Sequence, residues 1–124
     1  MWMDKICIED GTYSVFACIV RCGQDISVTV GGGESPHIGA SALAVPRPSL
    51  NDPEMCSAST SVFCITGHKE DEFARRAAQT LASRLNCAVN VTAGVHIDHA
   101  KPEELARLGK NLEALLCAVL EKLI

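Results

Sequence analysis

The sequence predicts a single α+β domain, a mainly antiparallel sheet with two helices. Three observations lead to this class. Strand-length apolar or alternating segments fill the first half of the chain, two segments of the second half repeat their apolar residues with helical spacing, and one strand-like segment separates those two. The predicted element order is β-β-β-β-α-β-α. A chain of 124 residues has room for one hydrophobic core, so residues 1–124 are expected to form one domain.

The first strands are read from apolar patterns between turn residues. Met3 to Ile8 can form a short strand that Glu9-Asp10-Gly11 ends. Tyr13 to Arg21 is apolar on both alternating faces, which indicates a strand covered on both sides. A turn at residues 22–25 and the alternating residues 26–30 complete a hairpin.

Small residues and prolines mark the middle of the chain. His37 to Val45 can form a strand stopped by Pro46 and Pro48, and its small side chains require a helix, a second subunit or a ligand to approach the backbone. Residues 46–56 contain three prolines and predict a long loop, which in a compact domain is often functional. Ser57 to Thr66 is the next predicted strand.

The last third predicts helix, strand and helix. Lys69 to Leu85 has acids in its opening turn and an apolar residue at every fourth position. Cys87 to Ala93 is the strand. Pro102 begins a second helix with a wide leucine stripe, and Gly109, which interrupts the stripe, is interpreted as a close crossing point.

Composition argues against several classes of function. The net charge is −4, the largest basic cluster is Arg75-Arg76 and aromatic residues are few, so a nucleic-acid binder is not expected. No apolar run reaches the roughly 18–20 residues that span a bilayer. Seven cysteines, an odd number without a Cys-x-x-Cys pair, fit a cytoplasmic protein with reduced, mostly buried thiols.

Polar residues at the predicted strand ends indicate an anion site. Backbone N–H groups of a glycine run, and an arginine held between two prolines, suit a phosphate. Each candidate also has a plainer explanation. The glycines can be a flexible connection and Arg47 a surface ion pair. Lys69, a further candidate before the first helix, can be a solvated charge. The candidate binding residues are Gly32, Gly33, His37, Arg47, Ser49, Ser57, Ser59, His68 and Lys69.

A metal site is a separate hypothesis. His96, Asp98 and His99 can converge on a divalent ion, with His37 or His68 completing the set. The alternative is that Asp98 caps the second helix beside a buried histidine. No residue is assigned a catalytic role, because the serines and cysteines lie in no nucleophile elbow or known cysteine–histidine spacing.

Several motifs in a fixed order resemble one family. They are Gly31-Gly32, Pro36-His37-Ile38-Gly39-Ala40, Pro46-Arg47-Pro48-Ser49-Leu50, Ser57-Ala58-Ser59, Gly67-His68-Lys69-Glu70-Asp71 and Gly94-Val95-His96-Ile97-Asp98. From about Tyr13 to Leu112 the chain resembles the LpdD-like prenylated-flavin chaperones, which are encoded beside UbiD-type aromatic acid decarboxylases. The resemblance implies a protein that holds or delivers prenylated flavin mononucleotide (prenylated FMN), or FMN itself, for such a decarboxylase. A flavin prenyltransferase is a further implied partner. The family is similar in fold to the proteasome assembly chaperones, small α+β proteins that dimerise.

The flavin hypothesis suits the residues, and two others stay open beside it. Small side chains at residues 39–44 permit close approach of a planar ring, and the loop at residues 46–50 can close over it. The leucine stripe and the small strand residues predict a homodimer. The alternatives are a metal-dependent enzyme using His96, Asp98 and His99 on a small substrate, and a protein-assembly chaperone without a small ligand.

The arginine supplies the first testable prediction. Arg47→Ala is expected to weaken flavin-nucleotide binding sharply and to leave the fold intact, because it removes the proposed phosphate donor. Fluorescence or calorimetric titration measures the affinity, and an unchanged value contradicts this assignment.

Overall fold

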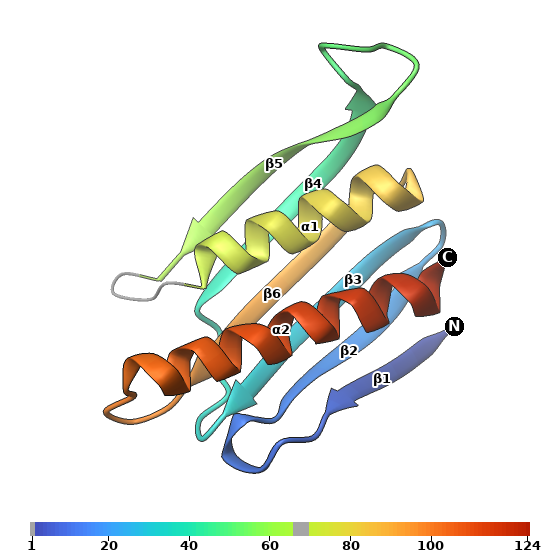
Figure 1. Cartoon of the computed structure of the whole chain (residues 1–124). Helices are drawn as coiled ribbons and strands as arrows, with labels where there is room; N and C mark the ends of the chain where they lie inside the picture. The colour runs from blue at the N-terminus through green and yellow to red at the C-terminus, as the bar shows by residue number, and fades with distance from the viewer. Residues whose placement is uncertain (1, 66–69) are drawn as a thin grey trace.

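A six-stranded sheet carries both α-helices on one of its faces (Figure 1). The computed structural model describes residues 2–65 and 70–124. Neither helix of the described chain has both the length and the apolarity that crossing a membrane requires. In chain order the elements are β1 Met3–Ile8, the 3-10 turn η1 Gly11–Tyr13, β2 Val15–Cys22, β3 Asp25–Gly33, β4 Ala40–Pro48, β5 Cys56–Cys64, α1 Asp71–Leu85, β6 Val89–His96 and α2 Pro102–Leu123.

The sheet is antiparallel except at its centre. Its strands lie in the order β1-β2-β3-β6-β4-β5. β6 runs parallel to β3 and antiparallel to β4, and the remaining pairs are antiparallel. The predicted class, α+β with a mainly antiparallel sheet and two helices, is therefore confirmed. The predicted order was one strand short, because Met3–Ile8 forms a full edge strand and five strands precede α1.

The two helices pack on the sheet through different kinds of side chain. α1 buries four alanines and one leucine, and it covers β4, β5 and part of β6. The strand residues beneath it are also alanines, among them Ala40, Ala42, Ala44 and Ala58. Of the three expected neighbours of the small-residue strand, it is a helix that approaches it. α1 covers the alanine side of β4. α2 lies over β1 and β2 and buries its leucine stripe there (Figure 1).

The glycine run at residues 31–33 forms the end of β3 and not a flexible connection. Gly31, Gly32 and Gly33 pair in register with the last three residues of β6. A Cβ at Gly32 would lie 2.5 Å from the Ser14 carbonyl oxygen. Gly33 has φ +72°, and a Cβ there would lie 2.3 Å from the carbonyl oxygen of His96. Close backbone packing requires these glycines. The sequence alone does not distinguish glycines of this kind from glycines in a flexible loop.

The two prolines lie inside β4 instead of ending it. β4 pairs with β6 only from Ala40 to Ala44, and beyond that point it pairs with β5 alone. Pro46 and Pro48 therefore lie where one side of the strand has no neighbour, and a missing N–H interrupts no ladder there. The expected loop at residues 46–56 shrinks to residues 49–55.

The second face of the sheet, which we call the open face, is covered by neither helix of the described chain. It presents alternate residues of each strand, including Phe16, Leu43, Val45 and Phe63. The expectation that β2 is covered on both sides is wrong, because Cys18 on this face is exposed. The expectation of mostly buried cysteines is also wrong, since Cys87 alone of the seven is buried.

Polar contacts fix the start of α2 against η1. The Tyr13 hydroxyl donates to the Glu104 carboxylate at 2.9 Å, and Asn111 donates to Asp10 at 2.9 Å. Arg107 donates to the same Asp10 carboxylate at 2.7 Å. Hydrogen bonds from Arg107 and then Asn111 lower the pKa of Asp10. The N-terminal half of α2 is therefore held by side chains at the edge of the sheet.

Gly94 supplies a prediction about stability. A Cβ at this position would lie 1.8 Å from the His37 carbonyl oxygen, so Gly94→Ala forces backbone to move. We expect the free energy of unfolding in urea to fall by about 2–4 kcal/mol. Gly109→Ala is the matched control, because a Cβ there meets nothing within 4 Å. It should gain roughly 0.5–1 kcal/mol of helix stability. Equal effects of the two substitutions would contradict this account.

Candidate cofactor site

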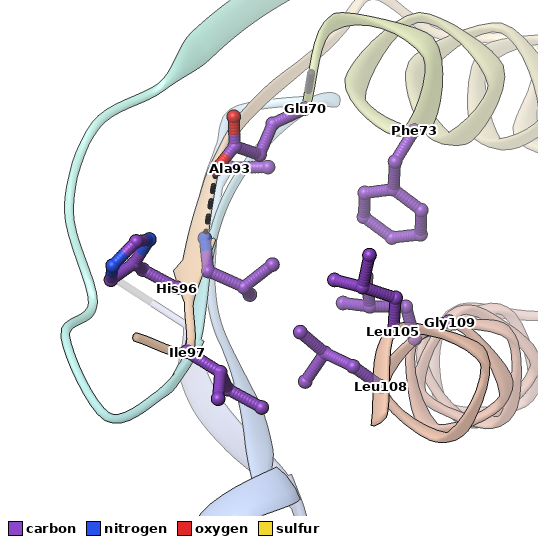
Figure 2. A pocket seen from close by; sticks show the side chains of 10 residues that line it. Glu70, Phe73, Ala93, His96, Ile97, Leu105, Leu108 and Gly109 are labelled. Carbon is purple, nitrogen blue, oxygen red and sulfur yellow. Dashed lines mark hydrogen bonds between the residues drawn. The ribbon is translucent and has the colours of Figure 1, made fainter. Parts of the chain in front are cut away.

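A cavity of about 310 Å³ lies between the two helices at the carboxyl end of β6 (Figure 2). Phe73 of α1 faces Leu105 and Leu108 of α2 across it, and the end of β6 forms its floor. Its lining is mostly aliphatic, as expected for the apolar part of a ligand. The apolar residues that line it include Phe73, Val95, Ile97, Leu105, Leu108 and Leu112.

One residue of α2 that lines the cavity has no side chain. Gly109 lines it, and a Cβ added there would meet nothing within 4 Å. The interpretation of this glycine as a close crossing point is therefore wrong. A leucine in the same place would continue the stripe and project into open space. The glycine keeps that space free at a cost of about 1 kcal/mol of helix propensity.

Glu70, the residue before α1, forms the polar edge of the cavity. Its Oε1 accepts a hydrogen bond from the Val95 backbone N–H at 3.3 Å, drawn in Figure 2, and lies 3.1 Å from His37 Nε2. The Glu70 side chain is 11% exposed. A Cβ at Gly39 would lie 2.6 Å from Glu70 Oε2, so this glycine makes room for the carboxylate. The start of α1 is thereby tied to β6 and to the segment before β4.

His96 lies beside the cavity, but its ring points away from it. Figure 2 shows the imidazole on the other side of β6 from Phe73 and the leucines. His96 Nε2 is 2.8 Å from Asp98 Oδ1, and the centroids of the His96 and His37 rings are 6.4 Å apart. The Asp98 backbone N–H donates to Glu34 at 2.8 Å. These contacts bring together the two predicted regions around His37 and His96.

The metal hypothesis gains no support from this arrangement. Among residues 2–65 and 70–124, no three His, Cys, Asp or Glu side chains lie close enough to hold a metal ion. The pair of His96 and Asp98 therefore lacks a third ligand within this part of the chain, and His99 does not supply it. The alternative role for Asp98 is also not observed, since Lys101 is the N-cap of α2 and its backbone N–H donates to the Glu104 carboxylate at 3.0 Å. His68 lies outside the described residues.

The predicted phosphate residues fall at two ends of the sheet. Gly32, Gly33 and His37 lie near the cavity end, whereas Arg47 is seven residues beyond Ala40 along β4, about 23 Å of extended chain. The Gly33 N–H donates to the Ser14 carbonyl at 3.0 Å, so it is engaged within the fold.

At the far end the predicted residues do meet. Arg47 Nε donates to Ser59 Oγ at 2.8 Å, and a second guanidinium nitrogen donates to the Pro48 carbonyl at 2.9 Å. Ser57 is the register partner of Arg47, and the Ser49 hydroxyl accepts from the Asn51 backbone at 3.2 Å. The single site expected from sequence is thus divided in two. His68 and Lys69 lie outside the described residues.

Several residues of the cavity were not singled out from sequence. Phe73 and the leucines carry the ordinary pattern of a core-facing helix, so the pattern could not mark them as a ligand surface. Gly109 was the one usable signal, because a glycine within an apolar stripe costs helix stability and needs a reason. Glu70 lies within the motif Gly67-His68-Lys69-Glu70-Asp71, yet only the fold places it against β6.

The fold has a counterpart among solved structures. The chain is similar to a chain in "Crystal Structure of a Novel Chaperone Complex for Yeast 20S Proteasome Assembly", with a TM-score of 0.59 and 19% sequence identity over 98% of this chain and 94% of that one. At this identity the likeness concerns the fold alone. No curated protein matches the chain. The family model described as "Prenylated flavin chaperone LpdD-like domain" matches residues 9–124. The chain therefore belongs to the LpdD-like prenylated flavin chaperone family.

Proposed function

We propose that this protein binds prenylated FMN in the cavity between α1 and α2, and stores or delivers it in the cytoplasm for a UbiD-type decarboxylase. Membership of the LpdD-like family supports the chaperone role. The observation that carries the choice of site is the apolar cavity held open by Gly109. In this proposal the protein has no turnover of its own, and the bound flavin supplies its chemistry only in the partner enzyme.

The cavity suits the ring end of a flavin. Ligand pockets in proteins commonly measure about 300–1,000 Å³ and combine apolar walls with a few polar groups. At about 310 Å³ this cavity is near the lower limit, so a ring system or its prenyl-derived part fits better than a whole nucleotide. Phe73 and the leucines exclude water from that part of the ligand.

The walls of the cavity are anchored on both sides. Glu70 ties the start of α1 to Val95 of β6, while Asp10 and Tyr13 tie α2 to the edge of the sheet. Because both helices are already anchored, the protein loses little conformational entropy when a ligand binds between them. This favours tight holding of a cofactor over loose, transient contact.

Filling the cavity tests the proposal directly. Gly109→Leu places a side chain in the open space and is expected to lower affinity for prenylated FMN by at least about tenfold without reducing the melting temperature. The protein is purified after co-expression with a flavin prenyltransferase, and its absorption spectrum and a fluorescence titration report bound flavin. Gly109→Ala, which adds one carbon, is the matched control. A colourless wild-type protein would contradict the function, and full binding by Gly109→Leu would contradict the site.

The same titration compares the two ends of the sheet. The sequence-based expectation that Arg47→Ala weakens flavin binding assumes that the site includes Arg47. Arg47 lies far along β4 from the cavity, so with the cavity as the site Arg47→Ala should instead bind flavin like the wild type. If Arg47→Ala loses binding and Gly109→Leu keeps it, the ligand lies instead beside the hairpin that β4 and β5 form.

We also propose that two copies of the chain pair through the open face. The homodimer is predicted from the leucine stripe of α2 together with the small strand residues, but both are buried inside the fold, among them Leu115, Leu116 and Ala42. Three apolar side chains on the open face are exposed instead: Leu43 by 49%, Val45 by 51% and Phe63 by 81%. A six-stranded face measures roughly 25 Å in each direction, an area of about 600 Å². That area approaches the roughly 800 Å² that each partner buries in a standard interface.

A single charge in the open face tests this pairing. Phe63→Glu is expected to give a monomeric mass in light scattering at micromolar concentration, because burying the carboxylate between two sheets is costly. Ala114→Glu, at an exposed position on α2, should keep the dimeric mass of the wild type. A monomeric wild-type protein over the same concentrations would refute the proposal.

A further inference from the structure

Building on the flavin function proposed above, we infer that Arg75 and Arg76 bind the phosphate of the nucleotide outside the cavity, and that Glu113 holds Arg76 until the phosphate replaces it. Neither arginine belongs to the predicted phosphate residues. Both project from α1 into a second hollow that adjoins the cavity.

The second hollow continues the first across Phe73. It has a volume of about 380 Å³ and shares Phe73, Gly109 and Leu112 with the cavity. Its other walls include Arg75, Arg76 and Glu113. One continuous surface therefore runs from aliphatic side chains at the floor of the cavity to two guanidinium groups at its outer edge.

The size of the cavity requires such an exit. If a space of about 310 Å³ is filled by the ring end of a flavin, the ribityl phosphate has to extend beyond it. The floor of the cavity is the carboxyl end of β6, and Glu70, whose carboxylate repels a phosphate, lines its far corner. Between α1 and α2 the way past Gly109 leads to the arginines.

Arg76 already makes the kind of contact that a phosphate would make. Its two terminal nitrogens donate to the two oxygens of Glu113, one of them at 3.0 Å, which is bidentate binding of an anion. The guanidinium also lies over the Phe73 ring, 5.7 Å from its centroid. The ring that lines both hollows therefore lies beside this guanidinium.

The contact with Glu113 is suited to exchange. Both side chains are about half exposed, at 49% for Arg76 and 52% for Glu113, and an exposed ion pair contributes little to stability. A phosphate carries more charge than a carboxylate and accepts from both arginines. Glu72 also lines this hollow, so two carboxylates offset the charge of the two arginines. A phosphate is therefore bound most strongly when Arg76 has left Glu113.

The experiment compares one ligand with and without its phosphate. Prenylated FMN and the same compound after phosphatase treatment are titrated anaerobically against the full chain, with flavin fluorescence as the readout. The wild type is expected to bind the phosphorylated form more tightly by about tenfold or more. The double variant Arg75→Ala/Arg76→Ala should reduce that ratio to near one while binding the dephosphorylated form normally. Arg84→Ala, on the same helix but outside the hollow, is the matched control and should keep the ratio.

Glu113→Gln is expected to change the affinity in the opposite direction if a phosphate replaces Glu113 at Arg76. Removing the competing carboxylate should tighten binding of prenylated FMN several-fold, with no effect on the dephosphorylated form. Equal affinities of the wild type for the two forms, or an unchanged ratio in the double variant, would overturn the phosphate site and leave the flavin function standing. A wild type that binds neither form would overturn both.

Discussion

The contact between α1 and the β4–β5 half of the sheet sets the geometry of the rest of the molecule. Alanines on the helix meet alanines on the strands, with Ala74 and Ala78 fully buried above β4 and β5. Small side chains on both sides let the helix axis lie close to the sheet. α2 packs on β1 and β2 through larger leucines, so the two helices settle on the sheet in different ways. The cavity lies where their facing sides no longer fill the space between them.

Backbone crowding at the end of β6 builds the polar corner of that cavity. Gly94 has no room for a Cβ because the segment before β4 crosses directly over it. That crossing brings His37 next to Glu70, and Glu70 in turn accepts from Val95. The position of the Glu70 carboxylate thus depends on glycines that are required for packing. This is a common way for rigid elements to hold a site in place.

The open face and the cavity suit different kinds of partner. The cavity is enclosed by two helices and is of small-molecule size, whereas the open face is broad, with exposed leucine, valine and phenylalanine. The proposed function uses both surfaces, the cavity for the cofactor and the open face for protein. The likeness in fold to a chain from a yeast proteasome-assembly complex shows that this architecture exists in proteins that share little sequence with it. Function in such folds depends on the site built into them.

The sequence by itself determined the fold class, the two helices and the family. Helical spacing, helix-starting residues such as Pro102 and the strand-length apolar segments are local signals, and each was read within its own segment. The motif order from Gly31 to Asp98 was sufficient to indicate the family. It could not show that Gly31 to Gly33 pair with β6, because crowded and mobile backbones both select glycine.

Only the tertiary structure decided which residues line the cavity. Arg47 and His37 are near one another in the chain, but an extended strand carries them to opposite ends of the sheet. Phe73 and Gly109 are far apart in sequence, and the packing of two helices on one sheet makes them neighbours around a cavity. Residue type predicts what a side chain can bind. Which side chains act together depends on register and packing, which the whole chain determines jointly.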